Sequence, residues 1–247
     1  MTPLTIVEVY PGSMFPQGDG GNLRALEHGA RARGVDVETL PAPVGDPLPE
    51  GDLYVLQGAE DEDQPVVAGR LREEGTLARA AAAGKVVVGI GAGYEILGKA
   101  FDPPEGVHTE GLGLLDVRTT LGEHVDNRVV TRPSPRLGLP ALVGYEWHRG
   151  RSTLGPEATP LAEVEIGVCN GCVPPTDGAV QGHVLGTYLH GPLLPRNPEL
   201  TDLLLGWALG VEPEPLPSEF AERARQERIA EAREIERRKQ GLLGRFR

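Results

Sequence analysis

One stretch, residues 85–98 with the sequence KVVVGIGAGYEILG, constrains the fold of this chain more than any other. Residues 86–90 are almost all β-branched and have no polar face, which is typical of a strand buried on both sides. Glycines at 89, 91 and 93 then crowd a tight turn, and residues 94–98 begin a helix. Such a strand, turn and helix is where α/β enzymes place a nucleophile on a strained elbow. At the apex, where a Ser or Cys would lie, this chain has Gly91.

The rest of the first half predicts a sheet around that strand. Short apolar runs at residues 5–10, 35–40 and 52–56 indicate strands, and residues 22–33 and 64–83 indicate helices that end at glycines. This alternation predicts an α/β fold with a doubly wound, mostly parallel sheet flanked by helices, of the flavodoxin-like kind. Because such sheets bind ligands at the carboxyl ends of their strands, the loops after residues 10, 56 and 90 are expected to meet at one site.

The second half is richer in Pro and Gly. We expect antiparallel additions to the sheet there, a further strand that ends before His190, and a helix after it. The segments concerned are residues 113–119, 127–132, 142–146, 161–167, 184–189 and 197–209. The PEPLP segment indicates a break, so we predict one domain over residues 1–211. Residues 212–247 then form a linker and a charged, solvated helix over 218–240, with Ser218 as its N-cap.

Charge and hydropathy exclude some classes of function. The formal net charge is −12 over 247 residues, which argues against nucleic acid as a partner because phosphate binding needs a basic face. No apolar run approaches the roughly 18 residues of a transmembrane helix, and the N-terminus lacks the basic and long apolar regions of a signal peptide. The sequence therefore predicts a cytoplasmic protein without membrane insertion.

Several motifs have weaker interpretations. Cys169 and Cys172, in CNGC, fit half a zinc site or a redox pair, but no second ligand pair exists and the segment is a Gly/Pro-rich loop, which favours incidental cysteines. The glycines of the turn are misplaced for a dinucleotide-binding GxGxxG. The acidic run at residues 61–63 could suggest a metal, although such runs usually begin solvated helices. A His at a strand end, such as His190, is either a general base or structural. The other histidines lack ligand spacing and are expected to be surface or satisfied core residues; they are His28, His108, His124, His148 and His183.

Seven stretches spread over about residues 4–210 carry a resemblance to a known family. They are TIVEVYP, GDGGN, LQGAEDEDQ, GIGAGYEILG, EGLGLLDVRTT, GYEWHRGRSTLG and GAVQGHVLGTYLHGPLLPRNPELTDLLL. In this order they resemble the CobQ/CobB-type class I glutamine amidotransferases, and are most similar to the GatD-type subunit of lipid II isoglutaminyl synthase. The last stretch is highly specific, whereas the glycine-rich ones alone are weak.

The resemblance implies a definite chemistry. Such subunits hydrolyse glutamine through a Cys thiolate activated by His and pass ammonia to a synthetase. That partner resembles a Mur ligase, called MurT, and uses ATP with Mg²⁺ to activate the D-glutamate carboxylate of the peptidoglycan stem peptide; no cofactor is implied for this chain. By the resemblance His190 matches the base, the amides of Gly58 and Ala92 form the oxyanion hole, and Arg128 matches a glutamine-positioning arginine. The position of the third triad acid of other class I enzymes is Pro192, and this subfamily commonly lacks the acid.

Departures from the family pattern gather at the elbow. The family reads Cys-(Gly or Ala)-Gly-Tyr-Gln where this chain has Gly91 through Glu95, so the thiol is replaced by hydrogen and an amide by a carboxyl group. Trp147 and Arg149 stand where the family prefers Asn and Gly. The sequence thus predicts a subunit that does not hydrolyse glutamine by the family mechanism. Two alternatives stay open: a module that binds glutamine or another small amine, and an enzyme that uses Glu95 and His190 as acid and base.

Overall fold

A computed structural model describes residues 3–14, 20–60, 62–103, 107–212, 214–216 and 218–243, with side chains to residue 239. It contains a six-stranded sheet in the order β11-β12-β4-β3-β1-β2, in which only β11 runs antiparallel to its neighbour. The strands of this sheet are β1 (Leu4–Val9), β2 (Val37–Ala42), β3 (Leu53–Leu56), β4 (Val86–Ile90), β11 (Ala179–Gln181) and β12 (Val184–Thr187). The predicted α/β fold with a mostly parallel sheet is confirmed.

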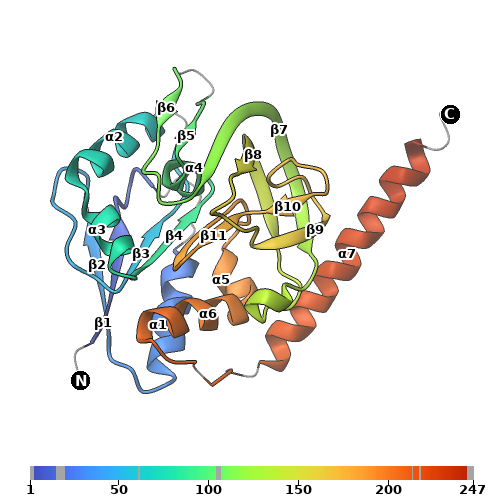
Figure 1. Cartoon of the computed structure of the whole chain (residues 1–247). Helices are drawn as coiled ribbons and strands as arrows, with labels where there is room; N and C mark the ends of the chain where they lie inside the picture. The colour runs from blue at the N-terminus through green and yellow to red at the C-terminus, as the bar shows by residue number, and fades with distance from the viewer. Residues whose placement is uncertain are drawn as a thin grey trace.

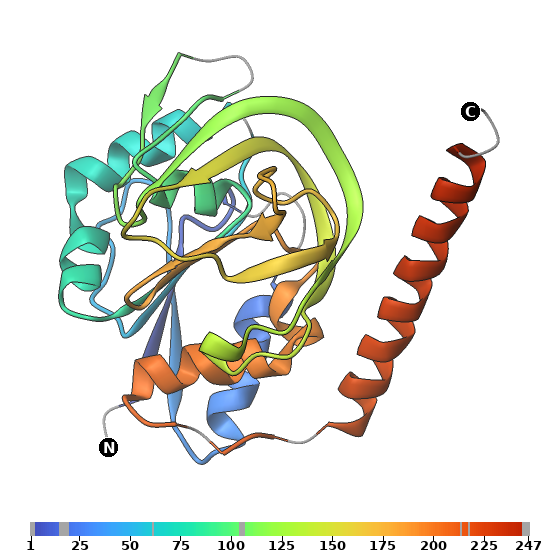
Figure 2. The same ribbon diagram turned by 45° about the vertical axis from the view of Figure 1, so that its right-hand side comes forward.

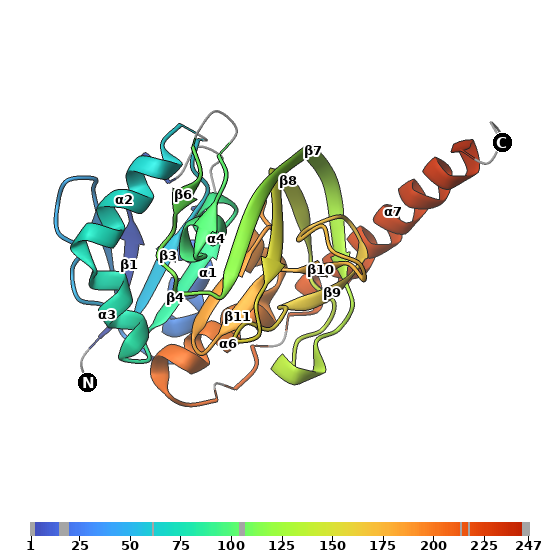
Figure 3. The same ribbon diagram turned by 45° about the horizontal axis from the view of Figure 1, so that its top comes forward.

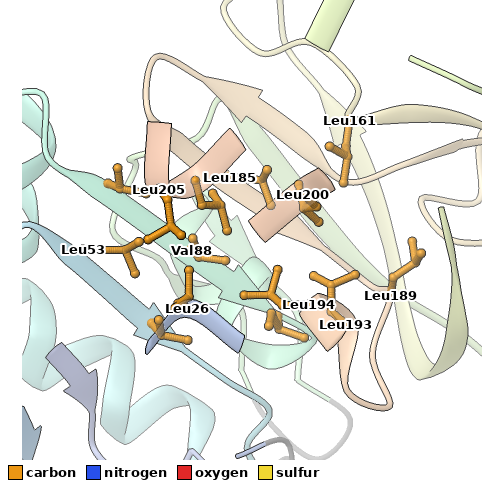
Figure 4. Packing of buried hydrophobic residues seen from close by; sticks show 14 of the residues in the cluster. Leu26, Leu53, Val88, Leu161, Leu185, Leu189, Leu193, Leu194, Leu200 and Leu205 are labelled. Carbon is orange, nitrogen blue, oxygen red and sulfur yellow. The ribbon is translucent and has the colours of Figure 1, made fainter. Parts of the chain in front are cut away.

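Helices cover both faces of this sheet (Figure 1). They are α1 (Gly21–Arg31), α2 (Gln64–Glu74), α3 (Thr76–Ala82), α4 (Ala92–Leu97), α5 (Leu193–Arg196) and α6 (Pro198–Leu209). Alternate side chains along β4 point to opposite faces of the sheet. Val86 and Val88 pack with α1 and α6, whereas Val87 packs with α2 and α3. Figure 4 shows the first of these cores, where Val88 lies among leucines from both the sheet and the helices that cover it. All five residues of β4 are buried, as the β-branched run predicts.

The helix predicted over residues 64–83 is in fact two helices. Gly75 ends α2 in the left-handed conformation, with φ of 69°, and its amide donates to the Leu71 carbonyl oxygen. The chain then turns into α3. The sequence pattern hides this break because the apolar residues continue at helical spacing on both sides of Gly75, while the glycine supplies the positive φ that a helix end requires.

The segments predicted between residues 113 and 167 form a separate sheet rather than antiparallel additions to the first, so that prediction is wrong. The antiparallel edge strand of the first sheet is β11, which none of those segments covers. The path of the separate sheet is β10-β9-β7-β5-β6, and β8 pairs with β7. The strands are β5 (Ala100–Phe101), β6 (Thr109–Glu110), β7 (Val117–Thr131), β8 (Val143–Leu154), β9 (Ala162–Ile166) and β10 (Thr176–Asp177), and a short 3₁₀ turn covers Pro135–Leu137. β7 and β8 are much longer than the predicted strands and form a curved hairpin beside the parallel sheet (Figures 2 and 3). Pairing between the two strands stabilises polar segments that have no strand pattern of their own.

The last helix, α7 (Glu219–Leu243), projects from the body beside the second sheet (Figure 1). The amide of Ala221 donates to the Ser218 hydroxyl at 3.1 Å, which confirms the N-cap. Ile229 and Ala232 pack on Val130 and Val143, and ion pairs with residues of the body hold the helix as well. The helix is therefore largely solvated, as expected, but anchored near its middle. The domain boundary at residues 211–212 stays a prediction.

Candidate functional site

The turn after β4 has the geometry of a nucleophile elbow. Gly91 lies between β4 and α4 with φ of 58° and ψ of −117°, a backbone conformation that L-residues rarely adopt. Gly89 and Gly93 allow the tight approach of strand and helix: a Cβ on Gly89 would lie 2.5 Å from the Gly93 carbonyl oxygen, and one on Gly93 would overlap the Leu56 carbonyl. A Cβ on Gly91 would meet only the Gly58 Cα, at 4.0 Å. The elbow thus has the strain of a nucleophile position and free space for a side chain.

A cavity of about 80 Å³ opens above Gly91. It lies at the carboxyl ends of β3, β4 and β12, as predicted for a parallel sheet. The β7–β8 hairpin forms its other wall. The lining residues are Gly58, Ala59, Gln64, Ile90, Gly91, Ala92, Glu95, Asp102, Leu121, His124, Trp147, His148, Arg149, Gly150 and His190. Of the described residues in the loop after residue 10, none lines the cavity, and residues 15–19 lie outside the described part.

His190 reaches the cavity from the chain that follows β12. Its amide donates to the Tyr145 carbonyl oxygen at 2.9 Å, and the Tyr145 amide donates to the His190 carbonyl oxygen at 3.1 Å. This bridge joins the end of the parallel sheet to β8 of the second sheet. The imidazole and Gly91 therefore line one cavity although 99 residues separate them in sequence.

None of the described residues that line the cavity is Cys, Ser, Thr or Lys. Cys169 is buried elsewhere, and Cys172 is exposed, with its sulfur 3.1 Å from the Pro174 carbonyl oxygen. Burial, together with the nearby Asp177 and Glu146, raises the pKa of the Cys169 thiol well above its usual value, so the thiol stays protonated. Neither cysteine can serve the elbow.

Glu95 places a carboxyl group in the cavity wall. Its side chain is 8% exposed, and Oε1 accepts a hydrogen bond of 3.0 Å from the Tyr188 hydroxyl. The Tyr188 and Ser152 hydroxyls lie 2.9 Å apart, and Ser152 is 2.8 Å from Thr119 in turn. Gly150 makes room for this group, since a Cβ there would overlap Glu95 Oε1 and the Tyr188 hydroxyl.

A second buried pair, Glu146 and His148, lies beside Glu95. His148 Nε2 is 3.2 Å from Glu146 Oε2, Nδ1 is 3.2 Å from the Gly150 carbonyl oxygen, and the ring stacks on Tyr188 at 3.7 Å. Both ring nitrogens thus lie within hydrogen-bond distance of an oxygen. Burial acts to raise the pKa of Glu146, but the His148 contact and the amides of Val168 and Cys169 outweigh it and hold that pKa below its usual value.

The sequence predicts that His148 is a surface or satisfied core residue, and it indicates no role for Glu146. The hydrogen bonds confirm a satisfied His148, which also lines the cavity. The signal was present in the alternation of β8: Glu146, His148 and Gly150 share the inward face, while Trp147 and Arg149 are exposed.

Asp177 holds the chain that leads to His190. The Thr187 hydroxyl and the Tyr188 amide both donate to its carboxyl group, and the Thr187 oxygen also accepts from the Leu189 amide at 3.0 Å. Complete burial raises the pKa of Asp177 to about 7, although these donors act to lower it. The carboxyl group fixes the last residues before the imidazole.

The structure brings five of the six predicted site residues to the cavity: Gly58, Gly91, Ala92, Glu95 and His190. No hydrogen bond among the described residues engages the amide of Gly58 or Ala92, which suits the predicted oxyanion hole. Arg128 lies instead on the outer face of β7, over the Tyr145 ring and 2.9 Å from Glu231 of α7. Its predicted role as a glutamine-positioning residue stays untested.

Two further predictions concern metals and membranes. Within the ranges that the structure describes, no group of three or more His, Cys, Asp or Glu residues could hold a metal ion. Asp61, part of the acidic run, falls outside those ranges. No helix in the described part of the chain is long and apolar enough to cross a membrane.

The structure combines a strained elbow after a central parallel strand with a His that follows the end of the neighbouring strand. These two features are typical of α/β proteins that perform nucleophilic chemistry at an elbow. Comparisons with known proteins narrow this class. A model of the CobB/CobQ-like glutamine amidotransferase domain matches residues 12–198. The chain belongs to this family of glutamine amidotransferases.

Individual relatives support the assignment. The subunit GatD of lipid II isoglutaminyl synthase (glutamine-hydrolyzing) from Staphylococcus aureus is 32% identical over 92% of this chain and 95% of its own length. The Streptococcus pneumoniae subunit of the same name is 27% identical over 83% of this chain and 80% of its own length. Among solved structures, PurLQS from Thermotoga maritima has a TM-score of 0.55 at 21% identity, covering 85% of this chain and 99% of that chain, which shows a shared fold.

Proposed function

We propose that this chain is the amidotransferase-like subunit of a complex of the lipid II isoglutaminyl synthase type, and that it does not hydrolyse glutamine by a thiolate mechanism. The similarity to GatD over nearly the full length supports the first part. The second part rests on one observation: the elbow keeps its strained geometry, but Gly91 offers no side chain, and no described lining residue is a Cys, Ser, Thr or Lys.

Apart from the nucleophile, the groups that the family mechanism uses are retained in this site. The amides of Gly58 and Ala92 and the imidazole of His190 surround the space above Gly91, yet without a thiolate no acyl-enzyme forms. Removing a catalytic nucleophile lowers the rate on the order of a million-fold. In this proposal the partner is a MurT-like, Mur-ligase-related synthetase in the cytoplasm that activates a carboxylate with ATP and Mg²⁺, and its nitrogen comes from free ammonia rather than from glutamine hydrolysed here.

Glutaminase activity of the chain, alone and with its synthetase, tests the proposal. We expect none from the natural chain, and a gain from Gly91→Cys because the space above the elbow accommodates a side chain. The activity of Gly91→Cys should vanish when His190→Ala is added. Gly182→Cys is a matched control: it has the same φ of 58° and no atom within 4 Å of its Cβ, but lies in the β11–β12 turn.

Two results would overturn the proposal. Glutaminase activity of the natural chain, lost with His190→Ala, would mean that the site needs no thiol. A chain that neither associates with a Mur-ligase-like synthetase nor alters ammonia-dependent amidation by it would remove the subunit role.

A further inference from the structure

The cavity above Gly91 is small compared with pockets that hold organic ligands. Its volume of about 80 Å³ is well below the roughly 300–1,000 Å³ of such pockets. The floor does not set this limit, because a Cβ added to Gly91 would meet only the Gly58 Cα, at 4.0 Å. The limit is therefore set by the side chains around and above the elbow.

Trp147 is the largest side chain among the described residues that line the cavity. It is 52% exposed, so the same residue faces both the cavity and the solvent. Leu121, which is 41% exposed, and the exposed His124 and Arg149 also line the cavity. Side chains that are exposed and also line a cavity lie at its opening, so these four residues form the mouth on the side of the β7–β8 hairpin.

The indole of Trp147 packs against an irregular part of this hairpin. The pairing of β7 with β8 is interrupted between residues 121 and 125. His124 from this interruption packs edge-on against Trp147, with 5.1 Å between the ring centroids. The Arg151 guanidinium donates to the Glu123 carbonyl oxygen at 2.9 Å and so fixes the interruption. Trp147 therefore has a positioned neighbour at the mouth.

A single exposed apolar side chain on a protein surface needs no functional explanation. Trp147 differs from such a residue because it lines the cavity that contains the elbow and packs on a fixed part of the hairpin. Replacing the indole by a methyl group would widen the mouth, whereas the floor at Gly91 would keep its shape.

We propose that Trp147 is a specificity-determining residue, which excludes glutamine from the elbow and admits molecules of the size of ammonia. The inference rests on the proposed function, which assigns this site to the glutamine amidotransferase family, and it adds a steric barrier to the missing thiol. The barrier acts by size: the indole narrows the mouth, so an α-amino acid cannot bring its side-chain amide to Gly91. A thiol restored at the elbow would then still be difficult for glutamine to reach.

Labelling of the thiol introduced by Gly91→Cys tests this barrier without any catalysis. Two chloromethyl ketones with the same electrophile are compared, namely chloroacetone and the analogue of glutamine in which a chloromethyl group replaces the amide nitrogen. In both reactions sulfur bonds to the chloromethyl carbon and chloride leaves. Peptide mass spectrometry gives the ratio of the two labelling rates, and the exposed Cys172 of the same molecules supplies the reference ratio.

We expect the preference for chloroacetone to be at least about tenfold greater at the introduced thiol than at Cys172. Adding Trp147→Ala should remove most of this difference, and Trp147→Leu should give an intermediate ratio. Phe220→Ala is the matched control, since it removes an exposed aromatic ring outside the cavity lining, and it should leave the ratio unchanged. A general loosening of the fold would speed both reagents alike, so the ratio separates a size barrier from destabilisation.

Three results would overturn the inference: equal ratios at the introduced thiol and at Cys172, faster labelling of the introduced thiol by the glutamine analogue, or a ratio that Trp147→Ala leaves unchanged. Glutaminase kinetics give a second measurement. In the Gly91→Cys background, adding Trp147→Ala should raise kcat/KM for glutamine at least about tenfold, and an unchanged value would contradict the barrier. Absence of glutaminase activity with and without Trp147 would contradict the retained site of the proposed function, while the labelling ratio would still decide the barrier.

Discussion

Alanine substitutions at three glycines around the elbow separate backbone strain from steric overlap. Gly91 has φ of 58° and no close neighbour, Gly93 faces the Leu56 carbonyl, and Gly58 has neither a positive φ nor an atom within 4 Å of the place that a Cβ would occupy. The three residues therefore differ in one physical property at a time, although all lie within the same site.

The structure sets the size of each effect. Forcing an L-residue into the Gly91 conformation costs about 1–3 kcal/mol, and the reduced freedom of the unfolded chain returns about 0.4–1 kcal/mol. We therefore expect Gly91→Ala to lower the free energy of unfolding by about 1–2 kcal/mol. Gly93→Ala should cost at least about 3 kcal/mol, at the upper end for overpacking, because β3 backbone must move. Gly58→Ala should stay within about 0.5 kcal/mol of the natural chain.

Urea unfolding followed by circular dichroism measures all three free energies, provided that the m-values agree. A loss for Gly91→Ala as large as for Gly93→Ala would refute the free space above the elbow. No loss for Gly91→Ala would refute the strain, and with it the interpretation of Gly91 as a nucleophile position. A costly Gly58→Ala would show that the loop after β3 is packed more tightly than the structure indicates.

Three further predictions concern the surroundings of the site. Burial raises the pKa of Asp177 to about 7, above an unfolded value of about 3.9, so between these values the folded chain keeps a proton that the unfolded chain releases. The free energy of unfolding should therefore fall as pH rises from about 4 to 7. In urea titrations Asp177→Asn should reduce this dependence of the unfolding free energy on pH; an unchanged dependence would assign it to other groups. Glu146→Ala leaves the part-buried amide of Val168 and the buried amide of Cys169 without their acceptor, and should cost about 3–5 kcal/mol by the same assay. The matched change at the exposed Glu163, Glu163→Ala, should cost less than about 1 kcal/mol. Deleting residues 212–247 should leave a folded, cooperatively melting domain that has lost at most about 3 kcal/mol, since Ile229 supplies most of the buried apolar contact; an unfolded product would contradict the predicted boundary.

The sequence was most informative where local pattern determines structure. The apolar run of β4 indicates a strand that is buried on both faces, and the glycines after it indicate a turn too tight for side chains. The central strand, the elbow and the parallel sheet could therefore be predicted. The same logic failed at Gly75 and in the β7–β8 hairpin. A glycine inside a helical pattern does not show whether the helix continues, and polar strand segments depend on a partner that lies far along the chain.

The sequence predicted which residues belong to the candidate site better than it predicted how they are arranged in space. Gly91 and His190 followed from strand ends and the family motifs, whereas the roles of Glu146 and Asp177 did not, because alternation along a strand identifies a face but not its partner. That a glycine occupies the elbow, and that a carboxyl group follows it at Glu95, can be seen in the sequence alone. The folded chain was needed to show that these two residues lie with His190 in one small cavity and that Arg128 lies outside it. The bridge between Tyr145 and His190 joins segments 45 residues apart, and the hydrogen bond from the Tyr188 hydroxyl to Glu95 joins segments 93 residues apart. Packing of the two sheets, not local propensity, brings these segments into contact.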